Sequence, residues 1–177
     1  MRWTRWCPPN SSKLQLKPRP GVYALITGTT LDKLCGPDPA GILYIGQSAN
    51  LRSRLRLKTN GEFNHSLLWY TVSKGNGNGQ LRVKLGIEAL GSKQVSKDAF
   101  ILFMYRSSKA SAVELEQALL AWHLGRFGQS PPLNARSPSM KSMADWWEDW
   151  WAQRLMKPTT RNIWNDLLKV GGGGQLG

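Results

Sequence analysis

The chain has 177 residues, 41% of them hydrophobic, which suits one packed domain and argues against general disorder. Its 24 Lys and Arg against 11 Asp and Glu give a net charge of +13, which favours a polyanionic partner over a basic surface kept for solubility. The sequence contains no apolar run of about 18 residues, so no membrane-spanning helix is predicted. The first ten residues lack the apolar core of a signal peptide. Cys7 and Cys35 form no CxxC pair, so we expect a cytoplasmic protein without a disulfide framework or a cysteine zinc site.

The first third of the chain predicts two strands and a helix. Residues 1–19 are rich in proline and basic residues and lack periodicity, which predicts an N-terminal arm. GVYALITG (21–28) and GILYIG (41–46) each predict a strand, and the glycines and prolines of 27–41 predict a long loop between them. This loop has little room for a helix, so we expect the two strands to pair antiparallel. ANLRSRLRLK (49–58) predicts a helix.

The next elements complete a small α/β (α+β) fold. Residues 60–98 predict a helical insert, with helical character over 62–74 and 80–90 on either side of a GNGNG break. AFILFMYRS (99–107) is apolar enough for a central strand, and SAVELEQALLAWHLGRF (111–127) predicts a long helix. Together these elements predict a three-stranded antiparallel sheet flanked by helices.

A Trp-rich helical extension is predicted over 137–170, with helices over 142–156 and 162–170. The glycines of 171–177 predict a flexible tail. The helix over 142–156 would have one wide aromatic face, formed by Trp146, Trp147, Trp150 and Trp151. This face could pack on the core, form a dimer interface or stack on bases, and the pattern leaves all three open.

The basic helix after the second strand is a candidate phosphate-binding element. Leu51 and Leu55 mark its buried line, and Arg54 and Lys58 fall together on a flank close to that line. A cation fixed by packing near a strand end can hold a phosphate, although Arg54 could equally extend along the core edge to solvent. Further candidates for nucleic-acid contact are Arg52, Arg56 and His65.

Two tyrosines lie at matching positions of the two expected strands. Side chains alternate along a strand, so Tyr23 shares a face with Gly21, and Tyr44 shares one with Ile42 and Gly46. A glycine two residues from each tyrosine would leave space beside each ring. The two phenols could therefore project toward one site, although a strand tyrosine is more often simply packed.

The helix 111–127 offers one acid without an evident structural role. Ser111 and Glu114 match a capping box, which accounts for Glu114. Glu116 falls at the border of the buried face, where it could reach solvent or bind a hard divalent cation such as Mg²⁺. His123 lies too far along the helix to bind the same ion, and we expect it on the helix surface.

These motifs together resemble the GIY-YIG nuclease family. The resemblance rests on GVY at 21–23 and on YIG at 44–46 followed by QSANLRSRL, and it covers roughly residues 20–135. It implies a nuclease core over 20–136 and a metal-dependent phosphodiesterase that cleaves DNA, expected to be double-stranded. With no second DNA-binding domain recognised, a site-specific, restriction-like endonuclease is expected, and a palindromic site would favour a homodimer.

The resemblance also assigns roles by position. Tyr23 and Tyr44 would flank the scissile phosphate, and Arg54 would stabilise its charge. Glu116 would hold Mg²⁺ or Mn²⁺, and Asn134 in PPLN would close the site.

Lys58 is the main departure, because many members carry histidine there. Lysine could bind phosphate or act as a base if its pKa were depressed, and His65 from the insert could instead supply an imidazole. A non-catalytic nucleic-acid-binding module and a DNA-repair or RNA-processing nuclease of the same fold remain alternatives.

Overall fold

The structure, a computed structural model, describes residues 2–6, 16–55, 68–72, 79–83, 100–134 and 158–172, with the backbone course alone for 68–72 and 79–83. The strands are β1 (Thr4–Trp6), β2 (Gly21–Ile26), β3 (Ile42–Ser48), β4 (Leu68–Val72), β5 (Gly79–Val83) and β6 (Phe100–Tyr105). The described helices are α1 (Leu51–Arg54), α3 (Lys109–Phe127) and α5 (Pro158–Gly171). The expected Trp-rich helix over 142–156 lies outside the described residues, as does 173–177.

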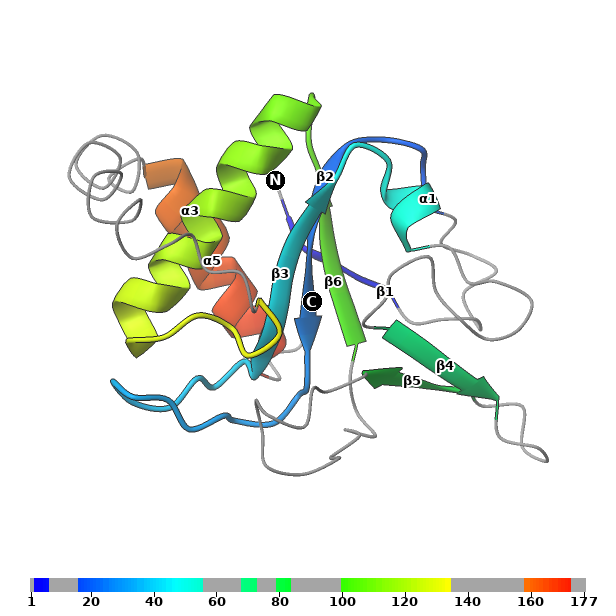
Figure 1. Cartoon of the computed structure of the whole chain (residues 1–177). Coiled ribbons are helices and arrows are strands. Elements are labelled where there is room, and N and C mark those ends of the chain that lie inside the picture. The colour runs from blue at the N-terminus through cyan, green and yellow to red at the C-terminus, as the bar shows by residue number, and fades with distance from the viewer. Residues whose placement is uncertain are drawn as a thin grey trace.

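A four-stranded antiparallel sheet forms the centre of the α+β fold (Figure 1), in the order β1-β6-β2-β3. The predicted antiparallel pairing of β2 with β3 and the interior position of β6 are confirmed. The sheet has one strand more than expected, because Thr4–Trp6, within the predicted N-terminal arm, pairs with β6. Trp3, just before this short strand, and Trp6, its last residue, are buried in the cores on opposite faces of the sheet, which anchors the strand.

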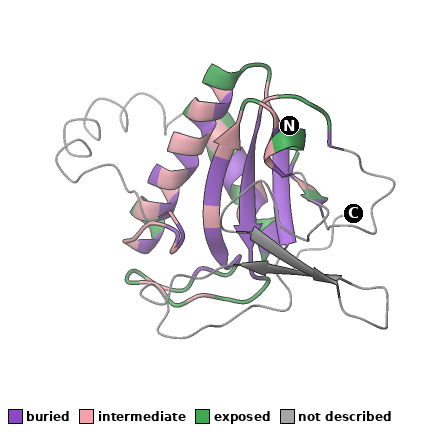
Figure 2. Ribbon diagram, turned by 45° about the vertical axis from the view of Figure 1, so that its right-hand side comes forward, coloured by how far each residue is buried: buried purple, intermediate pink, exposed green. Residues whose placement is uncertain are grey.

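Helices cover both faces of the sheet, and each face has its own apolar core. The helices α3 and α5 pack on one face, and α1 packs on the other (Figure 1). All six residues of β2 are therefore buried (Figure 2), with Val22 in the α3 core and Tyr23 in the α1 core. A register shift after Leu25 turns Ile42 into the α3 core, so Ile42 does not share a face with Tyr44 as expected.

The long helix α3 begins two residues earlier than predicted. Ser108 is the N-cap: its hydroxyl accepts from the N–H of Ser111, the third helical residue, and the Ser111 hydroxyl accepts from the Ser108 N–H. The expected capping box of Ser111 with Glu114 is therefore wrong, and Glu114 is exposed on the second turn. The helix ends at Gly128, whose φ of 71° is the left-handed conformation that glycine tolerates.

The helix α5 confirms the element predicted over 162–170 and extends it at both ends. Pro158 suits the first helical position because its missing N–H has no partner to lose. The Trp164 ring stacks on Trp122 of α3 at a centroid distance of 6.5 Å, and Trp3 Nε1 donates to the Ile163 carbonyl at 3.0 Å. Gly171, expected to begin a flexible tail, is instead the buried last residue of this helix.

The region between α1 and β6 contains strands where helices were expected. Within it, β4 and β5 pair antiparallel from Leu68↔Val83 to Val72↔Gly79. The helices expected over 62–74 and 80–90 are therefore wrong where these strands run. LWYTV is rich in aromatic and β-branched residues, which favour strands when a partner is available. Within the described ranges, no helix combines the length and apolarity needed to cross a membrane.

Candidate active site

The strand register brings Tyr23 and Tyr44 together on the α1 face of the sheet. Tyr23 pairs with Gly46, and Leu25 pairs with Tyr44, so the two phenols are diagonal neighbours with ring centroids 5.8 Å apart. A Cβ on Gly46 would lie 2.9 Å from each of the two hydroxyl oxygens. Both hydroxyls therefore converge over Gly46, and only glycine leaves them this room. The space beside Gly21 is different, because the Leu51 side chain fills it.

The short helix α1 holds Arg54 against this tyrosine pair. Asn50 caps the helix through a 3.0 Å hydrogen bond from the Ser53 N–H, and Leu51 and Leu55 are buried beneath it. Arg54 is half-buried, and its Nε donates to the Tyr23 hydroxyl at 3.2 Å. The guanidinium is thus held beside the sheet by packing and a hydrogen bond, which is one of the two arrangements that the leucine spacing left open.

Glu116 reaches the same region from α3. The Gln47 backbone N–H, at the end of β3, donates to the half-buried Glu116 carboxylate. Burial raises the pKa of Glu116 to about 7, although that hydrogen bond and the positive charge of Arg54 both act to lower it. The carboxylate is therefore close enough to Arg54 to feel its charge. This attraction does not fully compensate for the loss of water around the carboxylate.

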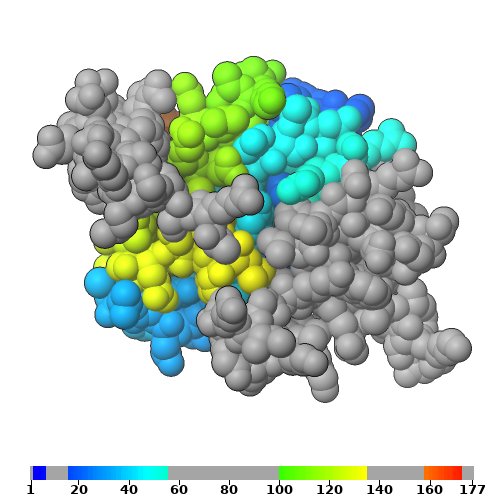
Figure 3. Space-filling view, in the orientation of Figure 1, coloured from blue at the N-terminus to red at the C-terminus, as the bar shows by residue number. Residues whose placement is uncertain are grey.

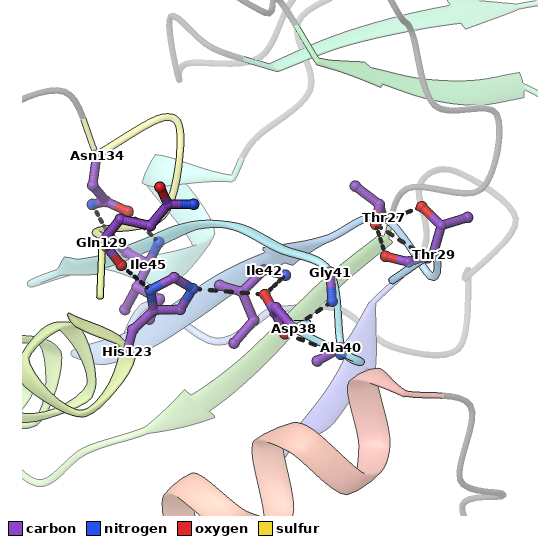
Figure 4. A network of polar contacts seen from close by, with 10 residues as sticks. All are labelled: Thr27, Thr29, Asp38, Ala40, Gly41, Ile42, Ile45, His123, Gln129 and Asn134. Carbon is purple, nitrogen blue, oxygen red and sulfur yellow. Dashed lines mark hydrogen bonds and ion pairs between the residues drawn. The ribbon is translucent and has the colours of Figure 1, made fainter. Parts of the chain in front are cut away.

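Asn134 binds the edge of β3 between these groups. Its Oδ1 accepts from the Ile45 N–H at 2.9 Å, and its Nδ2 donates to the Ile45 carbonyl at 2.7 Å (Figure 4). One residue earlier, the Leu133 N–H donates to the Leu43 carbonyl at 2.9 Å. Asn134 thus completes the open edge of the strand that carries Tyr44, a structural role that needs no substrate.

One residue of the region was missed by the sequence reasoning. Gln47 pairs with Val22, so its side chain lies on the α3 face, the face from which Glu116 comes. Its Oε1 is buried and has no hydrogen-bond partner among the residues that the structure describes. A buried amide oxygen without a partner costs about 1–3 kcal/mol, so this oxygen and the desolvated Glu116 carboxylate are candidate ligands for a cation. Its position directly after YIG was the available signal.

The remaining predicted residues divide into two groups. Arg52 is exposed on α1, two residues before Arg54. Arg56, Lys58 and His65 lie outside the described residues.

His123 is not the surface histidine that was expected. It is 0% exposed, its Nδ1 lies 2.8 Å from the Gln129 carbonyl oxygen, and its Nε2 lies 3.6 Å from Asp38 Oδ2 (Figure 4). The loop 27–41 and α5 cover this side of α3, and the Trp164 ring packs edge-on against the imidazole at a centroid distance of 6.2 Å. His123 therefore joins the loop to the core.

Asp38 is the loop residue that makes this connection. Its carboxylate accepts hydrogen bonds from the N–H groups of Ala40, Gly41 and Ile42, at 3.1, 3.2 and 2.7 Å. Burial raises the pKa of Asp38, but the neighbouring His123 and these N–H donors outweigh it and hold the pKa below its usual range. The turn-forming residues of DPAG were the sequence signal for this capped turn.

Replacing Asp38 with alanine is expected to destabilise the fold by about 3–5 kcal/mol, because three buried N–H groups and His123 lose their partner. Urea denaturation followed by circular dichroism measures the loss. Asp32→Ala is the matched control, because Asp32 is exposed on the same loop and should change stability by about 0.5 kcal/mol or less. Equal stabilities for the two variants would contradict this role of Asp38.

Comparisons with known proteins add no assignment. A scan against protein-family models, a search of curated proteins and a search of solved structures each found no match.

Proposed function

We propose that this protein is a metal-dependent endonuclease that hydrolyses phosphodiester bonds in double-stranded DNA. The observation that carries the proposal is the convergence of Tyr23, Tyr44 and Arg54 over Gly46, with the Glu116 carboxylate within range of the Arg54 charge. A binding module would not need a desolvated acid beside this cation. The net charge of +13 further supports a nucleic-acid substrate.

We further propose that the fold is of the GIY-YIG type. Three features support this: the two tyrosine-bearing strands are antiparallel neighbours, a basic helix follows the second strand, and a later helix brings an acid back to the same strand. These are the relations that the sequence motifs imply. The β4–β5 hairpin and the short strand β1 would be additions to such a core.

The residues present fit a divalent metal ion. Mg²⁺ prefers oxygen ligands and is commonly held by only one or two protein carboxylates, with water filling the other positions. Glu116 supplies a largely desolvated carboxylate, and Gln47 supplies a buried amide oxygen that has no partner within the described part of the chain. In the proposal these two side chains hold the ion. When bound there, Mg²⁺ would polarise a non-bridging phosphate oxygen and offset charge on the leaving oxygen.

Arg54 would stabilise the developing charge of the phosphate. A guanidinium stays protonated and has five N–H groups, so after its hydrogen bonds with Tyr23 and Tyr44 it would still have N–H groups to donate to phosphate oxygens. Because the side chain is already held in place, little reorganisation would be needed when the substrate binds.

The two tyrosines would have unequal roles. Tyr23 is 1% exposed, and burial together with the neighbouring Tyr44 raises its pKa far above the ordinary value, so Tyr23 would remain a neutral phenol that positions Arg54. Tyr44 is half-buried and thus reachable from solvent. We therefore assign the contact with the attacking water to Tyr44 and not to Tyr23.

Plasmid digestion tests the proposed function. With Mg²⁺ or Mn²⁺ the protein should cut supercoiled plasmid, and with EDTA it should not. Discrete fragments would support a restriction-like enzyme, and a smear would support cleavage without sequence preference. Plasmid that is bound but stays intact with either metal would overturn the proposal in favour of a non-catalytic binding module. An RNA substrate cut in preference to plasmid would move the activity to RNA processing.

A further inference from the structure

The segment before β2 and the helix α1 are joined by a hydrogen bond, and both carry exposed cations near the candidate site. The Leu51 N–H, at the start of α1, donates to the Arg19 carbonyl at 3.0 Å. Residues 16–20 and α1 accordingly lie side by side at the upper right of Figure 3. Lys17, Arg19 and Arg52 are all exposed there, and we call these three residues the basic rim.

Tyr105 holds the Lys17–Arg19 segment in place. The Lys17 N–H donates to the Tyr105 hydroxyl at 2.6 Å, and the Arg19 guanidinium carbon lies 5.8 Å from the centroid of the Tyr105 ring. Pro18 and Pro20 flank Arg19 and restrict its backbone, and the Arg106 N–H donates to the Pro20 carbonyl at 2.8 Å. The backbone that carries these cations is therefore held by hydrogen bonds to Tyr105 and Arg106.

The position of the basic rim relative to the candidate site is fixed, because α1 carries Arg52 of the rim and Arg54 of the site. Arg54 points to Tyr23, while Arg52 on the same helix is exposed, one residue after Leu51, whose N–H bonds to the Arg19 carbonyl. The exposed acids of the described residues, Asp32 and Glu114, belong instead to the loop 27–41 and to α3. The positive charge of this surface is thus not offset by a carboxylate on either of its two segments.

We infer that the basic rim binds the phosphate backbone of the DNA duplex next to the bond that is cut. This inference rests on the proposed function for the identity of the substrate, and it adds the direction in which the duplex leaves the site, over α1 and residues 16–20. The rim residues bind phosphates, so they add affinity and orientation without reading sequence.

The test measures binding of a fluorescein-labelled DNA duplex, in EDTA, over a series of salt concentrations. The double variant Arg19→Ala with Arg52→Ala should bind more weakly, and its slope of log affinity against log salt should fall by about 1.8, or about 0.9 for each phosphate that the protein no longer neutralises. The matched control, Arg126→Ala with Arg161→Ala, removes two exposed arginines from α3 and α5 and should leave the slope unchanged. Equal slopes for the two double variants would overturn the inference.

A double-mutant cycle tests whether Tyr105 positions Arg19 for DNA binding. Tyr105→Leu should weaken binding in the wild-type background and have a clearly smaller effect when Arg19 is already alanine. Effects of equal size in both backgrounds would contradict the role of Tyr105 in holding Arg19. Circular dichroism melting of each variant shows whether the fold is retained.

Failure of this inference is distinguishable from failure of the proposed function. If wild-type protein cuts plasmid but the basic rim variants bind like the control variants, the duplex leaves the site by another path. In the opposite case, the basic rim variants lose affinity and salt dependence, but neither they nor the wild type cut DNA with Mg²⁺. The DNA-binding role of the basic rim is then supported, and the nuclease proposal fails.

Discussion

Glu116→Gln should leave a protein that is more stable above neutral pH than the wild type and that no longer cuts DNA with Mg²⁺. Burial raises the pKa of the Glu116 carboxyl in the folded chain to about 7, from an ordinary value of 4.5. A carboxyl with a raised folded-state pKa favours folding while protonated, so this contribution is complete below about pH 4.5 and is lost as pH rises through about 7. The neutral amide removes that loss and can still accept the Gln47 N–H.

The expected gain is about 1–2 kcal/mol at about pH 8 and close to zero at about pH 5, after allowance for solvent screening of a partly exposed group. Urea denaturation at the two pH values measures it, and plasmid cleavage is followed in parallel. Glu114→Gln is the matched control, because Glu114 is exposed on the same helix and should change neither property. Cleavage by Glu116→Gln at the wild-type rate would remove Glu116 from the site.

Gly46→Ala should lower the cleavage rate at saturating DNA by about 100-fold while DNA binding is retained. The added methyl group would lie 2.5 Å from Tyr44 Cε1 and 2.9 Å from both tyrosine hydroxyls, so the rings have to move. Displacing a catalytic group by about 1 Å can cost about two orders of magnitude in rate. Single-turnover cleavage measures the effect.

Tyr44→Phe separates the position of the ring from the chemistry of its hydroxyl. This variant keeps the ring and removes the group to which we assign contact with water, so its rate should also fall, without the packing change of Gly46→Ala. Circular dichroism melting shows whether each variant is folded. A folded Gly46→Ala protein that cuts at the wild-type rate would contradict the role of the converging hydroxyls.

Local sequence patterns predicted the strands that carry the tyrosines and the helix that carries Arg54. Alternation put Tyr23 and Tyr44 on matching positions, and the long loop implied antiparallel pairing, as the structure has it. The leucine spacing of α1 predicted which arginine would be held beside the sheet. These features depend on neighbours within a few residues, which is the range over which such patterns are informative.

Features that depend on distant partners were predicted poorly. The strand β1 has three residues and exists because β6 offers it a free edge. The helix predicted over the β4 segment is wrong, because aromatic and β-branched residues form a strand when a partner strand is available. Here that partner is β5. His123 was expected on the surface because helical periodicity does not show that α5 and the loop 27–41 cover it.

The start of α3 was ambiguous for a different reason. SSKAS offers serines at several neighbouring positions, and Ser108 and Ser111 both satisfy the pattern of a cap. The structure assigns the cap to Ser108. This removes the argument that set Glu114 aside, and the case for Glu116 now rests on its burial and its hydrogen bond from Gln47.

The Mg²⁺ concentration that gives half-maximal plasmid cleavage, measured as a function of pH, tests the central claim most directly. If the Glu116 carboxylate holds the metal, protons compete for it below its pKa of about 7. The half-maximal Mg²⁺ concentration should then fall by about tenfold for each pH unit gained below that value and level off above it. Cleavage whose Mg²⁺ requirement does not change with pH across this range, or the absence of cleavage at every Mg²⁺ concentration, would contradict the account.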